Sequence, residues 1–325
     1  IGEDIALLEL HSPKNAIGDD IVSLITQTLA PASEPVRNFR GFVIASQASD
    51  FSVGANLMQL LLAMQEGEWD EVDLAVRAFQ RMTSAIKFCP RPVVAAPFNL
   101  CLGGGAEISL HAARRQPHAE LYMGLVESGV GIVPAGGGTK EMALRATDAA
   151  RAASKLDPAA NPAKFAQSAD LQHAVRQRFE TMALAKVSTS AAEARALDFL
   201  TTADRITMNR DHLIDDARAA ALELAESGYA APQSRSIPAA GDAALANLKL
   251  GIHLMRQAEF ISEHDARVAT QIARILCGGS VTPGSPVSEQ ALLDLEREAF
   301  LSLCGERKTQ ERIAYTLKTG KPLRN

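Results

Sequence analysis

Apolar and polar positions follow two different patterns along the chain. Up to residue 210, apolar runs of strand length are separated by segments with apolar residues at helical spacing. The strand-like runs are 5–10, 42–45, 93–96 and 121–126, and the helical segments include 21–29 and 70–88. Beyond residue 211 the helical spacing dominates, over 213–226, 243–258, 262–276 and 287–303. The pattern predicts an α/β region over 1–210 followed by a helical region over 211–325.

Polar and glycine-rich segments mark where these elements begin and end. We expect a surface excursion with some helix at 147–187, and a linker rich in Pro, Gly and Ser at 233–242. The other expectations are Asp19 or Asp20 as the cap of the first helix, Ser188 or Ser190 and then Asp211 as caps of later helices, a short strand at 204–208, and a loop through Phe98 and Asn99.

Residues 91–138 hold the pattern that points to chemistry. Two glycine triplets, Gly103–Gly105 and Gly136–Gly138, flank a unit with two acids, Glu107 and Glu127, each beside apolar residues. The first triplet follows a predicted strand and opens a segment of helix-forming residues, which places Glu107 in a first helical turn. Glycines there let a ligand approach the backbone, and the first amides of a helix can bind an anion or an oxyanion.

These features also have simpler structural explanations. Three glycines often form only a tight connection, and a glutamate in a first turn often only complements the helix dipole. The stretch GGGTK at 136–140 lacks the Gly-Lys-Ser/Thr ending of a P-loop, and no G-x-G-x-x-G follows a strand, so no nucleotide-binding fingerprint is present. His111 and His118 have no partner pattern, and we expect them at a helix end or at the surface.

Composition narrows the class of protein. The 325 residues are 47% hydrophobic and 22% charged, as in an ordinary globular protein with a sizeable core. A net charge of -5 and a pI near 5.9 argue against nucleic acid or an anionic membrane as main partner. No apolar run reaches the length of a membrane span. The four cysteines show neither CxxC spacing nor a nearby histidine cluster, so we expect reduced thiols, no metal site and a cytoplasmic location. The chain has no signal peptide and does not begin with Met, and we expect it to be a piece of a longer polypeptide.

Three stretches together resemble the enoyl-CoA hydratase (crotonase) superfamily. They are FSVGANL, RPVVAAPFNLCLGGGAEISL and LVESGVGIVPAGGGTKEM. Their order is that of the family's Gly-Ala-Asp loop, its Gly-Gly-Gly-x-Glu helix start, and its Glu followed by Gly and Pro-x-x-Gly-Gly. The C-terminal part is most similar to the hydratase segment at the C-terminal end of fused bacterial 3-hydroxyacyl-CoA dehydrogenase/enoyl-CoA hydratase proteins. The resemblance implies an α/β fold, a crotonase-like spiral of ββα units with a C-terminal helical region.

The resemblance also implies a reaction and the residues that perform it. An enoyl-CoA hydratase adds water to a trans-2-enoyl-CoA and gives a 3-hydroxyacyl-CoA in fatty-acid β-oxidation. The backbone N–H groups of Ala55 and Gly104 would form an oxyanion hole for the thioester oxygen. Glu107 is the expected base, which takes a proton from water, and Glu127 the expected acid, which protonates the α-carbon. The sequence does not separate these two roles.

Seven further residues match positions that contact the substrate in this family: Lys14, Ala16, Asn56, Leu57, Met58, Gly103 and Pro134. Lys14 would lie near the CoA phosphates, and a solvated turn lysine is an equal alternative. Asn56 stands where the family's loop usually has Asp, and Val126 where Pro often precedes the second Glu. With the insertion at 147–187, these departures are expected to change acyl chain-length preference rather than reaction type.

The resemblance also suggests partners. Crotonase-like proteins form trimers or dimers of trimers through their C-terminal helices, so a homo-oligomer is expected. No cofactor is expected in this segment because CoA is part of the substrate, and NAD is needed only if a dehydrogenase segment precedes this chain. Two alternatives stay open: an enoyl-CoA isomerase or other acyl-CoA enzyme of the same fold, and an inert structural domain that positions a dehydrogenase.

Overall fold

The computed structural model describes residues 1–2 and 4–325, which form two compact units. Unit 1 contains Ile1–Asn56, Ala75–Leu125 and Val187–Gln233, and unit 2 contains Leu57–Leu74, Val126–Lys186 and Ser234–Asn325. Each unit is therefore assembled from three separate stretches of chain. Unit 1 contains the parallel strands, and unit 2 is almost wholly helical.

A four-stranded parallel sheet forms the centre of unit 1. Its strands are β1 (Ile5–Glu9), β2 (Gly41–Ala45), β3 (Val93–Ala95) and β5 (Arg114–Arg115), in the spatial order β1-β2-β3-β5. Every residue of β2 and β3 is buried. Strands covered on both faces read as continuous apolar runs rather than as alternating ones, which is why the sequence predicts them correctly.

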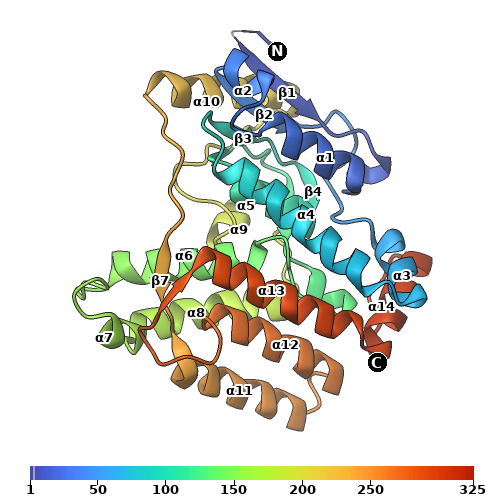
Figure 1. Cartoon of the computed structure of the whole chain (residues 1–325), viewed down its shortest axis with the longest axis vertical. Helices are drawn as coiled ribbons and strands as arrows, with labels where there is room; N and C mark the ends of the chain where they lie inside the picture. Colours follow the sequence, from blue (N-terminus) through green and yellow to red (C-terminus); the bar gives the residue numbers. More distant parts are fainter. Residues whose placement is uncertain (3) are drawn as a thin grey trace. The chain divides into compact units, whose positions relative to one another are not determined.

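Helices cover this sheet. α1 (Asp19–Thr28) and α2 (Glu34–Asn38) lie in the connection from β1 to β2, and α10 (Leu213–Glu226) packs on all four strands (Figure 1). The buried residues of α10 are Leu213, Ala217, Ala220 and Ala221. Their spacing is that of an amphipathic helix, and their small size lets α10 approach the sheet closely.

A second sheet of unit 1, with two strands, leads into the first glycine triplet, Gly103–Gly105. β4 (Asn99–Leu102) pairs in parallel with β6 (Leu121–Gly124). α5 (Gly104–His111) follows β4 directly and packs against it, and α9 (Ala191–Ala196) packs against β6. The expected order of strand, glycines and helix is therefore present, with the strand β4 placed between the predicted strand β3 and the triplet.

Unit 2 is built around α12 (Glu263–Leu276). This helix packs against α6 (Gly138–Ala153), α8 (Ala169–Ala183), α11 (Gly241–Gln257) and α13 (Glu289–Cys304), which Figure 1 shows side by side. α12 begins with a capping box, in which the side chains of Ser262 and Asp265 each accept a hydrogen bond from the other's backbone N–H. Because it has neighbours on several sides, α12 buries half of its residues.

Shorter elements complete unit 2. They are α3 (Leu57–Glu66), the 3-10 turn η2 (Glu127–Val130), α7 (Pro162–Ala166), α14 (Arg307–Thr319), and an antiparallel pair of β7 (Ser236–Pro238) with β8 (Pro286–Ser288). The segment 147–187, expected as a surface excursion with some helix, contains α7 and α8. One face of α8 is buried against α6 and α12, so this segment supplies part of the core of unit 2.

Several helix boundaries expected from the sequence are confirmed, and two caps are wrong. The helix expected at 70–88 is α4 (Trp69–Lys87), and Ser190 caps α9 by accepting a hydrogen bond from Glu193 N. Asp19 and Asp20 lie in the first turn of α1 and not at its cap, which is Gly18. Asp211 does not cap α10, because the 3-10 turn η3 (Arg210–His212) comes first and the Asn209 side chain accepts from Asp211 N.

Three expectations about strands are also wrong. Residues 204–208 form no strand, since Thr207 makes only an isolated bridge with His118. The expected linker 233–242 contains β7, which is stabilised by pairing with the distant β8. Of the loop expected through Phe98 and Asn99, Phe98 lies outside any strand as expected, but Asn99 is the first residue of β4. In each case the pairing partner is far away in sequence, so local composition does not reveal it.

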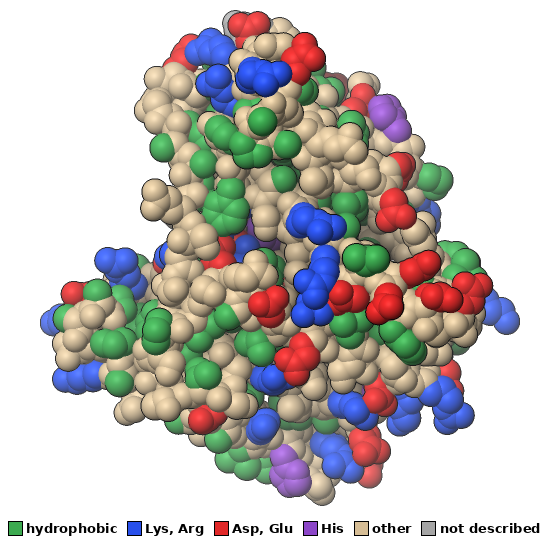
Figure 2. All heavy atoms as spheres, in the orientation of Figure 1, with side chains coloured by type: hydrophobic (Ala, Val, Ile, Leu, Met, Phe, Trp, Pro, Cys, Tyr) green, Lys and Arg blue, Asp and Glu red, His purple; other side chains and the backbone are tan. Residues whose placement is uncertain are grey.

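The surface of the molecule carries charges of both signs. On the face seen in Figure 2, acidic and basic side chains are interspersed. Among the helices described, none combines the length and the apolar character needed to cross a lipid bilayer.

Candidate active site

A short loop in unit 1, residues 52–56, is held on two sides by hydrogen bonds. On one side lies the turn of residues 12–17, and on the other side lies β4. The bonds to turn 12–17 are Val53 N to Lys14 O (3.3 Å), Ile17 N to Gly54 O (2.8 Å) and Asn56 N to Ile17 O (3.0 Å). Those to β4 are Ser52 N to Leu100 O (3.0 Å) and Leu102 N to Ser52 O (2.9 Å). Loop 52–56 is therefore fixed by main-chain bonds to two segments far away in sequence.

The amide of Ala55 differs from its neighbours in this loop. The other amides of residues 52–56 all donate hydrogen bonds, whereas the described part of the chain offers no acceptor to Ala55 N. Ala55 is exposed. The peptide that joins Gly54 to Ala55 is trans, so its carbonyl and its N–H point in opposite directions. Because Gly54 O accepts from Ile17 N, the Ala55 N–H points away from turn 12–17.

Gly54 brings this amide next to the start of α5. Its φ is +102°, and a Cβ on this residue would lie 3.1 Å from Leu102 O and 3.4 Å from Gly104 N. Gly103 is the N-cap of α5, and Gly104 N is one of the first amides of that helix, which have no partner inside the helix. Unit 1 therefore brings together the two segments that carry the predicted oxyanion donors, Ala55 N and Gly104 N.

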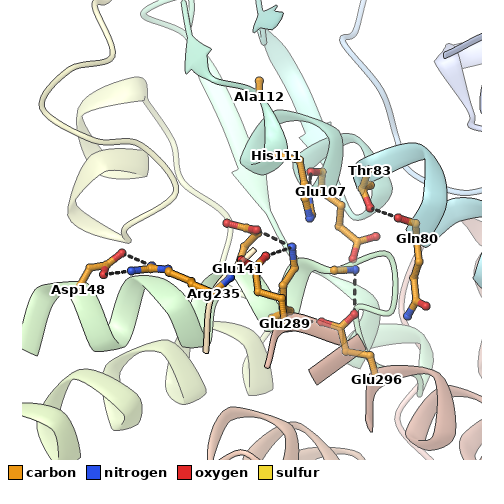
Figure 3. A network of polar contacts seen from close by, with 12 residues as sticks. Gln80, Thr83, Glu107, His111, Ala112, Glu141, Asp148, Arg235, Glu289 and Glu296 are labelled. Carbon is orange, nitrogen blue, oxygen red and sulfur yellow. Dashed lines mark hydrogen bonds and ion pairs between the residues drawn. The ribbon is translucent and has the colours of Figure 1, made fainter. Parts of the chain in front are cut away.

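Glu107 lies in the first turn of α5, as predicted, and is 4% exposed. Its backbone carbonyl lies 2.7 Å from His111 Nδ1, which must donate because a carbonyl oxygen only accepts. Every residue of α5 is buried, so the Glu107 carboxyl group is held in a largely desolvated position. Figure 3 labels Glu107 and His111 on this helix. His111 is at a helix end, as expected. His118, for which a helix end or the surface was also expected, is at neither, because it is buried and forms an isolated bridge with Thr207.

Glu127, the second predicted acid, opens the 3-10 turn η2 in unit 2 and is half-buried. The turn is anchored at both ends. Ser128 Oγ donates to Met182 O of α8 (2.7 Å), and Gly131 O, just past the turn, accepts from Thr309 Oγ1 of α14 (2.8 Å). These bonds fix the backbone that carries Glu127.

A histidine of α12 supports this anchor. His264 Nε2 lies 2.9 Å from Thr309 Oγ1. The single proton of the threonine hydroxyl goes to Gly131 O, so Nε2 is the donor in this pair. Burial, together with the charge of the nearby Arg312, lowers the pKa of His264, which favours the neutral ring. The ring and the hydroxyl thus form two consecutive hydrogen bonds, which connect α12 to Gly131 at the end of η2.

The second glycine triplet leads into a buried ion-pair network in unit 2 (Figure 3). Lys140 is 1% exposed, and its ammonium group lies 2.6 Å from Glu141 Oε1 and 3.4 Å from Glu289 Oε2. Burial disfavours the charged form, but these carboxylates together with Glu296 hold the pKa of Lys140 above its ordinary value. Lys140 is therefore held in its charged form by this network.

The N-terminus of α6 is occupied by a side chain of α13. Glu296 accepts hydrogen bonds from Gly137 N (2.8 Å) and Lys140 N (2.6 Å). A carboxylate at this position complements the partial positive charge of the helix start. The amides after the second triplet thus bind a carboxylate of the protein itself.

The predicted substrate-contact residues are distributed over both units. In unit 1, Lys14 and Asn56 are exposed, Ala16 is half-buried and Gly103 is buried. In unit 2, Leu57 and Met58 begin α3, with Met58 51% exposed, and Pro134 is buried and accepts a hydrogen bond from Thr139 Oγ1 (3.0 Å). Within unit 1, Lys14, Ala16, Asn56 and Gly103 lie on segments that the hydrogen bonds of loop 52–56 join or adjoin.

Sequence reasoning missed the residues that hold these segments in place. Asn15 and Ser52 of unit 1 are each 0% exposed, and their hydrogen bonds link turn 12–17 to loop 52–56. Ser52 belongs to the FSVGANL stretch, and Asn15 lies between two predicted substrate-contact residues, but a small polar residue in such a place carries no sign of its partner. In unit 2, Glu296 lies in the helix expected over 287–303 and Thr309 in the wider helical region expected over 211–325, and neither pattern indicates a hydrogen-bond partner.

The cysteines take no part in these arrangements. All four are buried free thiols. Burial raises the pKa of Cys101 to about 12, although a contact with Ser109 acts in the opposite direction. Within residues 1–2 and 4–325, no group of three or more His, Cys, Asp or Glu side chains is arranged to hold a metal ion.

The chain is similar to known proteins in sequence and in fold. A family model described as enoyl-CoA hydratase/isomerase matches residues 1–156. A "Probable 3-hydroxyacyl-CoA dehydrogenase" of Bacillus subtilis (strain 168) is 44% identical over 325 residues, which are 100% of this chain and 38% of that protein. "Enoyl-CoA hydratase domain-containing protein 2, mitochondrial" of Bos taurus is 31% identical over 137 residues, 42% of this chain and 45% of that protein. The chain thus spans less than half the length of these relatives.

Among solved structures, an enoyl-CoA hydratase from Bacillus halodurans matches with a TM-score of 0.61 at 17% sequence identity, over 97% of both chains. The fold is therefore that of the crotonases, a mixed α/β structure with a parallel sheet. The family model adds that the first part of the chain, residues 1–156, is similar to the enoyl-CoA hydratase/isomerase family. The fold class predicted from the three sequence motifs is confirmed, and the predicted resemblance to the enoyl-CoA hydratase/isomerase family is confirmed over residues 1–156.

Proposed function

We propose that this chain is an enoyl-CoA hydratase that acts on trans-2-enoyl-CoA. The observation that supports the proposal most strongly lies within unit 1. There, the Ala55 amide, which donates to no described residue, is held beside the Gly104 amide, in the first turn of the helix that carries Glu107. Two such donors stabilise negative charge on a thioester oxygen, and loss of one typically costs about 2.7–4 kcal/mol of transition-state stabilisation.

In the proposed reaction, two carboxyl groups transfer the protons. As the water oxygen bonds to the β-carbon, the Glu107 carboxylate accepts a proton from that water. The electrons of the double bond move toward the thioester oxygen, where the amides of Ala55 and Gly104 donate hydrogen bonds. The protonated Glu127 then gives its proton to the α-carbon, and exchange with solvent restores both groups. Water is added and no cofactor is consumed.

Conversion of each glutamate to glutamine tests the roles of the two acids. Glu107→Gln and Glu127→Gln keep the shape of the side chain and remove its proton transfer, so each should lower kcat with trans-2-enoyl-CoA by roughly 10²–10⁴-fold. Hydration is followed by the loss of the absorbance of the conjugated enoyl thioester. Glu120→Gln is the matched control, because Glu120 is an exposed residue of unit 1 outside the proposed machinery and should leave kcat unchanged.

Each outcome has a definite meaning. Parent-like turnover in both Glu107→Gln and Glu127→Gln would overturn the proposed mechanism. Absence of any turnover by the parent chain, tested with short and long acyl groups, would favour an inert structural domain.

An isomerase is the second candidate, because the matching family model covers both hydratases and isomerases. Isomerisation moves a proton along the acyl chain and adds no oxygen, so a single carboxyl group is sufficient for it. Reaction in ¹⁸O-labelled water separates the two candidates by mass spectrometry. A hydratase gives a labelled 3-hydroxyacyl product, and an isomerase interconverts 2-enoyl and 3-enoyl thioesters without label.

We further propose that the chain acts as part of a fused dehydrogenase and hydratase protein in the cytoplasm. The product of hydration is a 3-hydroxyacyl-CoA, and the Bacillus subtilis relative, of which this chain covers 38%, is named as a probable dehydrogenase of that compound. NAD would be required by the dehydrogenase segment alone. A homo-oligomer, a trimer or a dimer of trimers, is the assembly we expect, and sedimentation equilibrium of the purified chain measures it.

A further inference from the structure

Ser52 joins three segments of unit 1 through one side chain and its own backbone. It is 0% exposed. Its hydroxyl donates to Asn15 O in turn 12–17 (2.7 Å) and accepts from Gly54 N in loop 52–56 (3.1 Å). A hydroxyl has one proton and two lone pairs, so both bonds form at the same time. The backbone of Ser52 is bonded to β4 as well, so this residue has no freedom to adjust.

Ser52 also determines how closely loop 52–56 approaches α5. A Cβ on Gly105 would lie 2.7 Å from Ser52 Cβ and 3.0 Å from Ser52 Oγ. The serine side chain therefore packs directly on the backbone of the first turn of α5, next to Gly104. Its position sets the distance between loop 52–56 and the helix start.

Asn15 holds the other end of this connection. It is 0% exposed and has a φ of 51°, in the left-handed region. Its Nδ2 donates to Ser46 Oγ (2.8 Å) and to Asp50 O (2.9 Å), while its Oδ1 is buried and has no partner among the described residues. An unsatisfied buried acceptor and a left-handed residue each cost free energy. The surrounding hydrogen bonds keep this costly conformation in place, as often occurs at functional sites.

The hydrogen bonds around Gly54 determine the orientation of the Gly54–Ala55 peptide. Ser52 Oγ binds Gly54 N, and Ile17 N binds Gly54 O, so both polar groups of Gly54 are fixed. With Gly54 O held toward turn 12–17, the Ala55 N–H points to the opposite side. Loss of the Ser52 hydroxyl would release Gly54 N and Asn15 O together. It would thus loosen both residue 54 and turn 12–17, the two segments that the bond between Ile17 N and Gly54 O joins.

We propose that Ser52 and Asn15 are positioning residues that set the direction of the Ala55 N–H for a thioester oxyanion. The inference rests on the proposed function, because it requires an acyl-CoA thioester as substrate. Neither residue is expected to touch the substrate, and both act through Gly54. A misplacement of about 1 Å far from the reacting atoms can lower a rate about 10²-fold.

The first test is Ser52→Ala with trans-2-enoyl-CoA, beside the control Ser109→Ala. Ser109 is also 0% exposed and lies in α5, but its hydroxyl contacts only Cys101 Sγ at 3.4 Å among the described residues. We expect Ser52→Ala to lower kcat by roughly 10- to 100-fold with little change in KM, because an oxyanion donor acts mainly in the transition state. Ser109→Ala should leave both constants unchanged. Equal kinetic effects of the two variants would overturn the inference.

A double variant separates positioning from general loss of stability. If Ser52 and Asn15 act through the same peptide, adding Asn15→Ala to Ser52→Ala should lower kcat by much less than the product of the single effects. Where Ser52→Ala folds poorly, Ser46→Ala replaces it, because it removes one of the two acceptors of Asn15 Nδ2 and spares loop 52–56. Ser46→Ala should lower kcat and leave KM unchanged, and parent-like kcat in this variant would count against the inference.

A spectroscopic measurement distinguishes failure of this inference from failure of the proposed function. Acetoacetyl-CoA loses its C2 proton to the buffer and forms an enolate with its own absorption band. An oxyanion hole lowers the pH at which this enolate forms, whether or not the chain hydrates anything. If the parent shifts that pH and Ser52→Ala shifts it equally, the inference is wrong and the oxyanion hole stands. If the parent causes no shift, the proposed oxyanion hole and the inference both fail.

Discussion

Substitution of Gly54 by Ala tests whether the backbone of loop 52–56 sets the catalytic rate. The added Cβ would lie 3.1 Å from Leu102 O and 3.4 Å from Gly104 N, and it would stand on a backbone with φ of +102°. A positive φ costs roughly 1–2 kcal/mol in a residue with a Cβ, so we expect the free energy of unfolding to fall by at least that amount. To relieve the close contacts, either the loop or the start of α5 must move, and each carries a proposed oxyanion donor.

Gly54→Ala should also lower kcat. Complete loss of one oxyanion donor lowers kcat by roughly 10²–10³-fold, and this sets the upper end of the range for Gly54→Ala. The lower end is about tenfold, for a displacement that weakens the hydrogen bond without breaking it. KM should change little, because the donors bind the transition state more strongly than the substrate. Steady-state hydration of trans-2-enoyl-CoA measures both constants, and urea denaturation measures the free energy of unfolding.

Gly228→Ala is the matched control for backbone strain. Gly228 also lies in unit 1, with a φ of +79°, and a Cβ there would meet no atom within 4 Å. This variant should lose a similar roughly 1–2 kcal/mol of stability and keep the kcat of the parent. If Gly54→Ala also keeps parent-like kcat and KM while Gly228→Ala behaves as expected, the reasoning that links Gly54 to the proposed oxyanion hole is refuted.

Two further predictions concern buried hydrogen bonds. Asp204 accepts five hydrogen bonds from Arg115 and Thr201. Asp204→Asn leaves the buried guanidinium of Arg115 uncompensated, so it should lower the free energy of unfolding, measured by urea denaturation, by about 3–5 kcal/mol. Burial acts to raise the pKa of Asp204, but Arg115 and Thr201 hold it below its ordinary value. The contribution of Asp204 to the free energy of unfolding is therefore fully present above about pH 3.9, the ordinary pKa, and is lost as pH falls through the folded-state pKa. In acid, the free energy of unfolding should fall more in the parent than in Asp204→Asn. Thr309→Val removes the hydroxyl that links His264 to Gly131 O, and it should cost about 1–3 kcal/mol and lower kcat several-fold if η2 positions Glu127. A parent-like kcat at reduced stability would show that this anchor is structural only.

The parts of the candidate site that depend on one stretch of chain could be predicted from the sequence. Gly103–Gly105 are found at the start of α5 because glycine accepts the backbone geometry of a tight helix entry, and Glu107 falls in the first turn as a direct result of its spacing from them. The apolar run that becomes β3 is continuous because both faces of the strand are buried. Each of these inferences uses residues within one element, where periodicity and backbone preference are decisive.

The parts that depend on two distant stretches could not be predicted. Ser52 and Asn15 are 37 residues apart, and Glu296 binds amides of residues more than 150 positions away. A serine or a glutamate has several possible partners in any fold, and only the topology decides which one is near. The same reason explains the missed strand β7, which is three residues long and contains a proline, and exists because β8 lies beside it.

The two proposed oxyanion donors could be predicted only in part. They are backbone N–H groups, and any residue type except proline supplies one. A sequence can therefore indicate such a donor only through the residues that must be small around it. Gly54 and Gly105 are of this kind, since a Cβ on either would meet Gly104 N or the Ser52 side chain within 3.4 Å. The motif glycines thus predict where two segments approach one another. The direction of the Ala55 N–H, in contrast, follows from the bond between Ile17 N and Gly54 O, which is visible only in the folded chain.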